Sequence, residues 1–151
     1  MNSTIITKIN TFLKNRLIEL SGTLLILVSI FIFLSIFTYS IGQDNFITRQ
    51  ENQETDFQNF GGFYGSAFAD FLLQALGFIV FLFNFNLFFW GFRLITDKKI
   101  SKFITKTFYT SIYIIFGTVF FNIKDFFSEL GWFLQGSGGF VGRIIKDKIF
   151  Y

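Results

Sequence analysis

The sequence predicts an all-α fold, a polytopic helical membrane protein with three transmembrane helices and an incomplete fourth at the C-terminus. Of the 151 residues, 52% are hydrophobic and 15% are charged, which leaves too few charges to cover the surface of a water-soluble domain. Three apolar runs have the length that a helix needs to cross bilayer hydrocarbon. The basic residues lie beside these runs, where lipid headgroups and membrane topology explain them.

The N-terminal segment, residues 1–19, is basic, with apolar residues every three or four positions and Lys8 and Lys14 between them. This pattern predicts either a short amphipathic helix lying on an anionic membrane surface or a frayed cytoplasmic tail. The first span is expected over 20–41, closed by Tyr39, a residue type that favours membrane interfaces. A secretory signal peptide would have an apolar region of about 7 to 15 residues and a small-residue cleavage site, so we interpret this segment as an uncleaved helix.

The second span is expected over 71–92, which carries no formal charge. It follows an external acidic loop, 42–58, whose carboxylate spacing does not fit a calcium loop, and a glycine-rich helical segment, 59–70. Asp70 and Arg93 bracket the span. Centring the span on Asp70 would cost about 2.5 to 3.5 kcal/mol, which favours the bracketed placement.

Small residues four positions apart precede the second span, and amide side chains occur within it. Small pairs let two helix backbones approach closely in lipid, and amides hydrogen-bond across helices. The alternatives are a flexible loop for the glycines and a solute pathway for the amides. We favour packing because three amides and one carboxylate make a poor proton relay. The predicted helix-packing residues are Gly61, Gly62, Gly65, Ser66, Ala69, Asp70, Gln74, Asn84, Asn86, Gly138 and Gly142.

The second half of the chain begins with a basic loop, 93–106, which carries five basic residues and one acidic residue. The basic bias of this loop and of the N-terminal tail predicts that both are cytoplasmic. The third span is expected over 107–123, about the minimum length. Residues 124–151 are expected to form an external, interfacial segment anchored by Trp132, with a glycine-rich turn that starts a missing fourth span.

That turn repeats an earlier pattern. Residues 61–65 read GGFYG and residues 138–142 read GGFVG, each after a span and an outside loop. If the two are equivalent, the chain is one helical hairpin followed by a second whose returning helix is missing. The alternative is a chance match.

The absence of cysteine and histidine from the sequence excludes a disulfide, a thiol nucleophile, a Ser-His-Asp triad and an ordinary zinc site. The sequence also lacks a phosphate-binding Gly-x4-Gly-Lys-Ser/Thr loop and a Gly-x-Ser-x-Gly elbow. We therefore predict no catalytic, cofactor-binding or metal-ligating residue, and we expect that the chain is not an enzyme.

Several segments together resemble the N-terminal membrane domain of the FtsK/SpoIIIE DNA translocases, and the resemblance covers nearly the whole chain. The most specific part, NFGGFYGSAFADFLLQALG, is similar to the family's Asn, Gly-x-x-Gly-Ala, Ala-Asp, Phe-Gly pattern, with Ser66 and Leu76 where Ala and Phe are common. The other segments are LIELSG, FTYSIGQDNF, WGFRL and GGFVG.

The resemblance implies four spans, a linker and a cytoplasmic RecA-like ATPase that pumps duplex DNA through a hexameric ring at the division septum. Because the sequence contains neither linker nor motor, it implies the anchoring part alone: a multi-pass protein of the bacterial cytoplasmic membrane that supports septal targeting. The expected partners are the lipid bilayer, further copies of the chain in a homo-oligomer, and division-septum membrane proteins, with no direct DNA contact. ATP and Mg would belong only to the motor of a longer parent protein, so no cofactor is expected here.

Two other functions remain open. A small transporter or channel subunit would use Asp70 and the span amides and would conduct ions or solutes when reconstituted alone. An unrelated structural membrane protein would use its glycine motifs only to form oligomers.

Overall fold

The computed structural model describes residues 2–40, 59–99, 102–124, 133–134 and 136–150. Within these residues the secondary structure is entirely helical, and the helices are α1 (Asn2–Phe37), α2 (Gly62–Leu76), α3 (Ile79–Asp97), α4 (Phe103–Lys124) and α5 (Gly139–Phe150). Helices α1, α3 and α4 are long and apolar enough to cross a membrane. The predicted all-α membrane fold with three spans is therefore confirmed.

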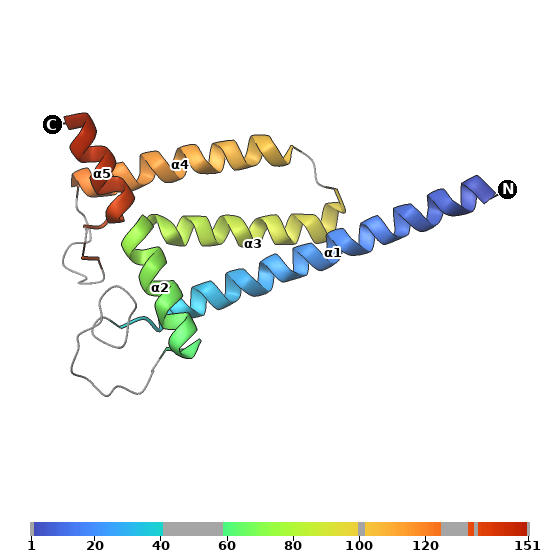
Figure 1. Cartoon of the computed structure of the whole chain (residues 1–151), viewed down its shortest axis with the longest axis horizontal. Coiled ribbons are helices and arrows are strands. Elements are labelled where there is room, and N and C mark those ends of the chain that lie inside the picture. Colours follow the sequence, from blue (N-terminus) through green and yellow to red (C-terminus); the bar gives the residue numbers. More distant parts are fainter. Residues whose placement is uncertain (1, 41–58, 100–101, 125–132, 135, 151) are drawn as a thin grey trace.

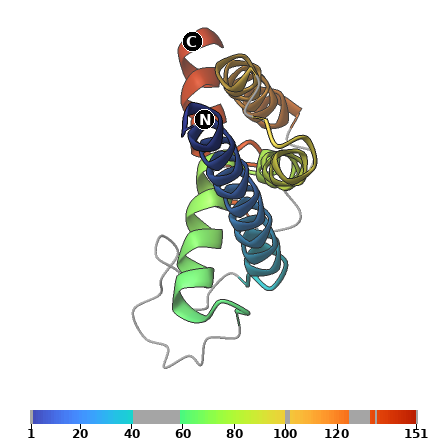
Figure 2. The same ribbon diagram turned by 90° about the vertical axis from the view of Figure 1, so that its right-hand side faces the viewer.

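The helices divide into a long set and a transverse set. Helices α1, α3 and α4 lie roughly side by side, while α2 runs across them near one end, as both views show (Figures 1 and 2). Helix α5 crosses the same end of α4 (Figure 1). Because the long helices cross the bilayer, α2 and α5 lie close to one membrane surface.

Helix α1 is continuous, which differs from the predicted separation of a tail (1–19) from a span (20–41). Its 36 residues make about 54 Å of helix, far more than the roughly 30 Å of bilayer hydrocarbon. A helix without a break does not let its N-terminal part bend to lie on the membrane surface. It extends beyond the other helices instead (Figure 1).

The second predicted span, 71–92, is broken at Gly77, so its boundaries were wrong. Gly77 has φ +62° and ψ −142°, a conformation that side chains with a Cβ rarely adopt. The chain changes direction there, and the span is α3. The predicted glycine-rich helical segment, 59–70, consists of a turn followed by the first part of α2, and Asp70 lies in the middle of that transverse helix rather than at the edge of a span.

Helix α5 lies where the sequence predicted a turn without a returning helix. Its 12 residues give about 18 Å, too short to cross a bilayer. The predicted acidic loop, 42–58, and the predicted anchor Trp132 lie outside the described residues.

The long helices pack unequally. The α1–α3 pair makes the most extensive contact, and its backbones touch: a Cβ added to Gly22 would lie 2.7 Å from the carbonyl oxygen of Gly91, and the reverse distance is also 2.7 Å. Helix α4 contacts α3 much less and α5 much more. Just before α3, the ring of Phe78 contacts the ring of Phe121 in α4, with centroids 5.3 Å apart.

The buried core lies where the end of α1 meets α2 and the start of α3, while much of the long helices' apolar surface stays exposed, as expected in lipid. The core residues are Ile32, Ile36, Tyr39, Ala69, Leu72, Leu73 and Val80.

Candidate functional site

Both transverse helices begin with the same glycine turn. The Gly62 N–H donates to the carbonyl of Asn59 (2.8 Å), and the Gly139 N–H donates to the carbonyl of Gly136 (2.9 Å). Gly62 and Gly139 have positive φ, +58° and +66°, which glycine adopts at little cost. The repeated GGF motif of the sequence is therefore a repeated turn into a transverse helix.

The first turn is held by Asn59. Its buried amide donates from Nδ2 to the carbonyl of Ser35 at the end of α1 (2.8 Å), and its Oδ1 accepts the N–H of Gly61 (3.0 Å). The Phe60 N–H donates to Thr38 Oγ1 (3.0 Å). Since buried amides need such partners, Asn59 ties the turn to α1.

Gly61 and Gly65 let α2 lie directly on α1. A Cβ on Gly61 would lie 2.9 Å from the Phe31 ring, and one on Gly65 would lie 2.9 Å from Ser35 Oγ. A Cβ on Gly62 would meet nothing within 4 Å. Gly62 therefore serves the backbone conformation, and the other two serve close packing.

The second turn is held by a different amide. Asn122 of α4 donates from Nδ2 to the carbonyl of Gly139 (2.9 Å), and Ser137 Oγ donates to the carbonyl of Phe121 (2.8 Å). These bonds tie the start of α5 to the end of α4. The amide that holds the second turn thus belongs to a helix, whereas the amide that holds the first turn, Asn59, belongs to the turn itself.

Gly138 and Gly142 bring α5 against the backbone of α4. A Cβ on either glycine would collide with the carbonyl oxygen of Thr118. Because that oxygen belongs to the backbone of α4, it cannot move away by a change of side-chain rotamer.

The two transverse helices meet at Gly77. The Phe78 N–H donates to the carbonyl of Ser137 (2.8 Å), and a Cβ on Gly77 would lie 2.7 Å from the amide nitrogen of Gly139. In turn, a Cβ on Gly139 would lie 2.7 Å from the carbonyl oxygen of Ala75. The end of α2 and the start of α5 thus form one tight junction, which we call the glycine junction: Gly77, Ser137, Gly138 and Gly139.

A buried polar network lies beside this junction. Asp70 is fully buried, and its Oδ1 accepts a hydrogen bond from the Tyr39 hydroxyl (2.7 Å) and a longer one from Gln74 Nε2 (3.4 Å). Gln74 Oε1 accepts the N–H of Leu134 (3.0 Å). The network joins the segment after α1, helix α2 and the segment before α5. Tyr39 is therefore part of the interior rather than the interfacial anchor that the sequence predicted.

The remaining predicted residues are distributed between the core and the spans. Ala69 and Ser66 are buried on α2. Asn84 on α3 is buried as well, and its carbonyl and its Oδ1 both accept from Ser29 Oγ of α1 at 3.0 Å. This bond lies within the α1–α3 pair, beside a mainly apolar pocket of about 260 Å³.

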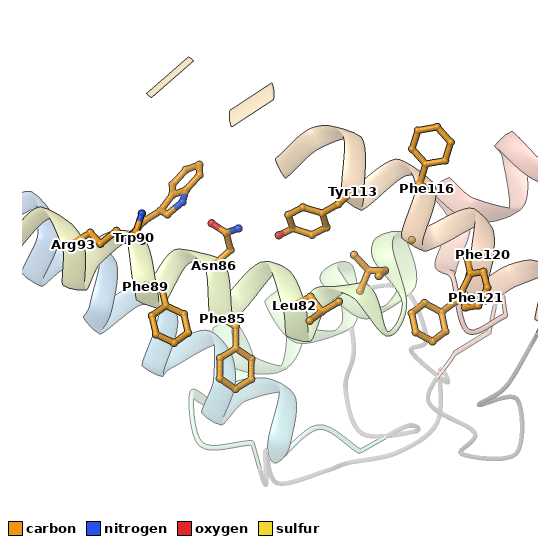
Figure 3. Close-up of a pocket in the computed structure, with 12 residues that line it drawn as sticks. Leu82, Phe85, Asn86, Phe89, Trp90, Arg93, Tyr113, Phe116, Phe120 and Phe121 are labelled. Carbon is orange, nitrogen blue, oxygen red and sulfur yellow. The ribbon is translucent and has the colours of Figure 1, made fainter. Parts of the chain in front are cut away.

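Asn86 lies in a groove of about 810 Å³ between α3 and α4, lined mainly by aromatic and aliphatic side chains. Figure 3 shows the Tyr113 hydroxyl of α4 directed toward the Asn86 amide. Asn86 Oδ1 and Tyr113 Oη are buried, and among the described residues neither has a hydrogen-bond partner.

The geometry fixes helices against one another rather than presenting a reactive group. Asp70 is enclosed by Tyr39 and Gln74, and among the described residues no group of three potential metal ligands comes together. The sequence did not predict the packing roles of four residues: Tyr39, Asn59, Asn122 and Ser137. The position of Asn59 and Ser137 beside the GGF motifs was an available signal, whereas Asn122 in the third span had none.

The comparisons with known proteins bear on the family. Searches of curated proteins and of solved structures find no match. The family described as the 4TM region of DNA translocase FtsK/SpoIIIE matches residues 14–149, which includes both GGF turns, the glycine junction, most of α1 and the whole of α3 and α4. The chain therefore belongs to the family of the 4TM region of FtsK/SpoIIIE DNA translocases.

Proposed function

We propose that this chain is the membrane-anchoring domain of an FtsK-like cell-division DNA translocase, acting in septal targeting and assembly. The observation that carries the proposal is the family match over residues 14–149. The geometry supports a tethering role, because the glycine junction is a site of close backbone packing between helices. The chain itself has no catalytic role in this proposal, and ATP and Mg would serve a motor outside it.

The proposed partners are the lipid bilayer, division-septum membrane proteins and further copies of the chain, without direct DNA contact. Lipid is supported by the exposed apolar surfaces of the three spans. The transverse helix α2 also exposes Phe63, Tyr64, Phe68 and Phe71, and aromatic side chains favour the headgroup region of a membrane.

The transporter or channel alternative has less support. Its carboxylate, Asp70, is fully buried and hydrogen-bonded, and the Asn84 side chain is bonded to Ser29. One measurement distinguishes the anchor from the transporter or channel. If the chain is an anchor, the purified chain in liposomes should show no ion or solute flux above that of empty liposomes. Flux through the chain alone would favour the alternative.

We also propose that the N-terminus is cytoplasmic, in the bacterial inner membrane. The end of α3 and the residues after it carry Arg93, Lys98 and Lys99, and Lys98 Nζ lies 2.6 Å from Glu19 Oε1 of α1. Positive charge marks the cytoplasmic side. In the cysteine-free chain, Tyr64→Cys should react with an impermeant thiol reagent from outside the cell, and Lys99→Cys should react only after lysis. The reverse pattern would invert the topology.

Septal targeting is tested by the location of a fluorescent fusion of the full chain in dividing rod-shaped bacteria. We expect enrichment at the septum over the lateral membrane. A matched pair of variants separates targeting from mere insertion: Gly62→Ala, with free space around it, should keep the enrichment, while Gly139→Ala, within the glycine junction, should weaken it. A uniform membrane signal from the wild-type fusion would contradict the proposal.

A further inference from the structure

Helix α1 carries a regular apolar stripe that no described helix covers. Its members alternate four and three residues apart, which is the heptad spacing of coiled coils. The stripe, which we call the α1 seam, consists of Ile6, Asn10, Leu13, Leu17, Leu20, Leu24 and Leu27.

The α1 seam lies opposite the face that packs on the bundle. The bundle face includes Ile18 and Ser29, which are 4% and 2% exposed, whereas Leu17 and Leu20 of the seam are 64% and 67% exposed. In heptad terms the bundle face takes the b, c and f positions, across the helix from a and d. Helix α1 therefore has two apolar faces, and the bundle uses one.

The N-terminal part of the seam lies beyond the bundle. The end of α3 reaches the level of Glu19, where the Lys98 ammonium contacts its carboxylate, and α1 continues past that level for about 17 residues, or about 25 Å. A lone helix of this length is marginally stable in water. Ile6 and Leu13 in this part are 57% and 53% exposed, so a covering partner would stabilise it.

We propose that the α1 seam pairs with the α1 seam of a second copy in a parallel, two-stranded coiled coil. Two copies inserted in the same membrane orientation present their seams in parallel, and identical seams match in register. Asn10 is the one polar member and occupies an a position, where a single asparagine specifies register and oligomer state.

The flanking charges permit this pairing. In a parallel pair each g residue faces the e residue five positions later on the partner helix. Ile9 then faces Lys14, and Arg16 faces Ser21, so no like charges are opposed. Arg16 is also engaged within its own helix, with its guanidinium 5.0 Å from the Phe12 ring centroid and bonded to Glu19.

The inference names a surface and a partner for the proposed anchor, but it depends only on the membrane fold. Its test is therefore separate from septal targeting. Single cysteines are placed in the cysteine-free full chain at the seam positions Asn10, Leu13 and Leu17, with Lys8 and Asn15 at f positions as controls. The chain is oxidised in native membranes.

We expect disulfide-linked dimers at the three seam positions, severalfold more than at Lys8→Cys and Asn15→Cys. Equal cross-linking at all five positions, or none at the seam, would overturn the proposal. Because all five positions lie beyond the bundle, none of these substitutions disturbs the packing of the spans.

The competing occupant is the membrane surface, which a second measurement detects. A Phe12→Trp variant in which Trp90 and Trp132 are replaced by Phe, so that residue 12 carries the only tryptophan, should show no more quenching by brominated lipids than a tryptophan in water, since the helix projects away from the bilayer. Strong quenching would overturn the coiled coil.

A third measurement uses energy transfer between labelled copies of the chain. The double variant Leu13→Glu with Leu17→Glu should abolish this transfer, and Asn10→Leu should keep it. Unchanged transfer in the glutamate variant would also contradict the proposal.

Discussion

The α1–α2 hairpin and the α4–α5 hairpin use the same turn but different means of holding it. In both, a glycine with positive φ starts a transverse helix after a hydrogen bond to the residue three positions earlier. In the first, the amide of Asn59 reaches back to α1, and in the second, the amide of Asn122 reaches forward to α5. The comparison teaches that the backbone turn is specified locally, while the amide that secures it comes from whichever neighbour the fold supplies.

The hairpins also differ in what surrounds them. The first is continued by α3, which returns along α1 with touching backbones at Gly22 and Gly91. In the described part of the second, α4 is secured mainly at one end by α5. Packing in the first hairpin is thus spread over two interfaces, and packing in the second is concentrated at the glycine junction.

The largest expected effect comes from placing one methyl group at equivalent positions of the two turns. Gly62→Ala should cost about 1 to 2 kcal/mol of unfolding free energy, because its only penalty is the positive φ. Gly139→Ala has the same φ penalty and adds a collision with Ala75, so about 1 to 3 kcal/mol more is expected from overpacking. Reversible unfolding in mixed micelles measures both. Equal losses would mean that the two turns are packed alike.

The next effect compares glycines on the long helices. Gly91→Ala would place its Cβ 2.7 Å from the Gly22 carbonyl, a backbone atom, and should cost about 1 to 3 kcal/mol. At Gly117 of α4 the nearest atoms belong to the Ile79 side chain, which can rotate, so Gly117→Ala should cost less. Unfolding titrations of the two single variants decide this. A larger loss at Gly117 would show that α4 depends on α3 more than its contacts indicate.

A smaller effect is expected from the polar network. Tyr39→Phe removes the 2.7 Å hydrogen bond to Asp70 and should cost about 1 to 2 kcal/mol. A double-mutant cycle of Tyr39→Phe with Asp70→Asn measures the coupling between the two side chains. Zero coupling would show that the pair does not join α2 to α1. Tyr64→Phe serves as the control, because Tyr64 is 80% exposed.

The smallest effect belongs to the α1–α3 pair. Ser29→Ala removes the hydrogen bond to Asn84 and should cost about 0.6 kcal/mol, the average for such bonds in membranes. The unfolding midpoint in mixed micelles should shift slightly while the cooperativity is unchanged. A loss comparable to that of Gly91→Ala would mean that hydrogen bonding, and not backbone contact, holds this pair.

Much of the fold could be predicted from apolar run length and charge placement, because lipid demands long helices and expels charge. The positions at which helices break or continue could not be predicted in this way. Run length alone cannot distinguish a continuous span from a transverse helix followed by a span, since α2 and α3 are both apolar and Gly77 is one glycine among 13. At the N-terminus, a change from polar to apolar residues suggested two elements, yet α1 runs through the change without a break.

The site was predicted in part. Small residues four apart marked Gly61 and Gly65, which do lie at the α1–α2 contact, and the GGF repeat marked both transverse helices. Gly62, however, has open space around it, and the buried Oδ1 of Asn86 accepts no hydrogen bond from the described residues. A spacing rule gives the residues that can face a neighbour, but not which of them have one.

Local sequence is enough to establish that the chain is helical, that lipid surrounds its spans and where its glycine turns occur, because these follow from local composition and backbone freedom. The packing of the whole chain is needed to place α2 and α5 across the bundle, to let Tyr39 donate to Asp70 and to let Asn122 hold the second turn. Such contacts join residues up to 60 positions apart, and their partners are chosen by the packing of whole helices, which no short stretch of sequence specifies.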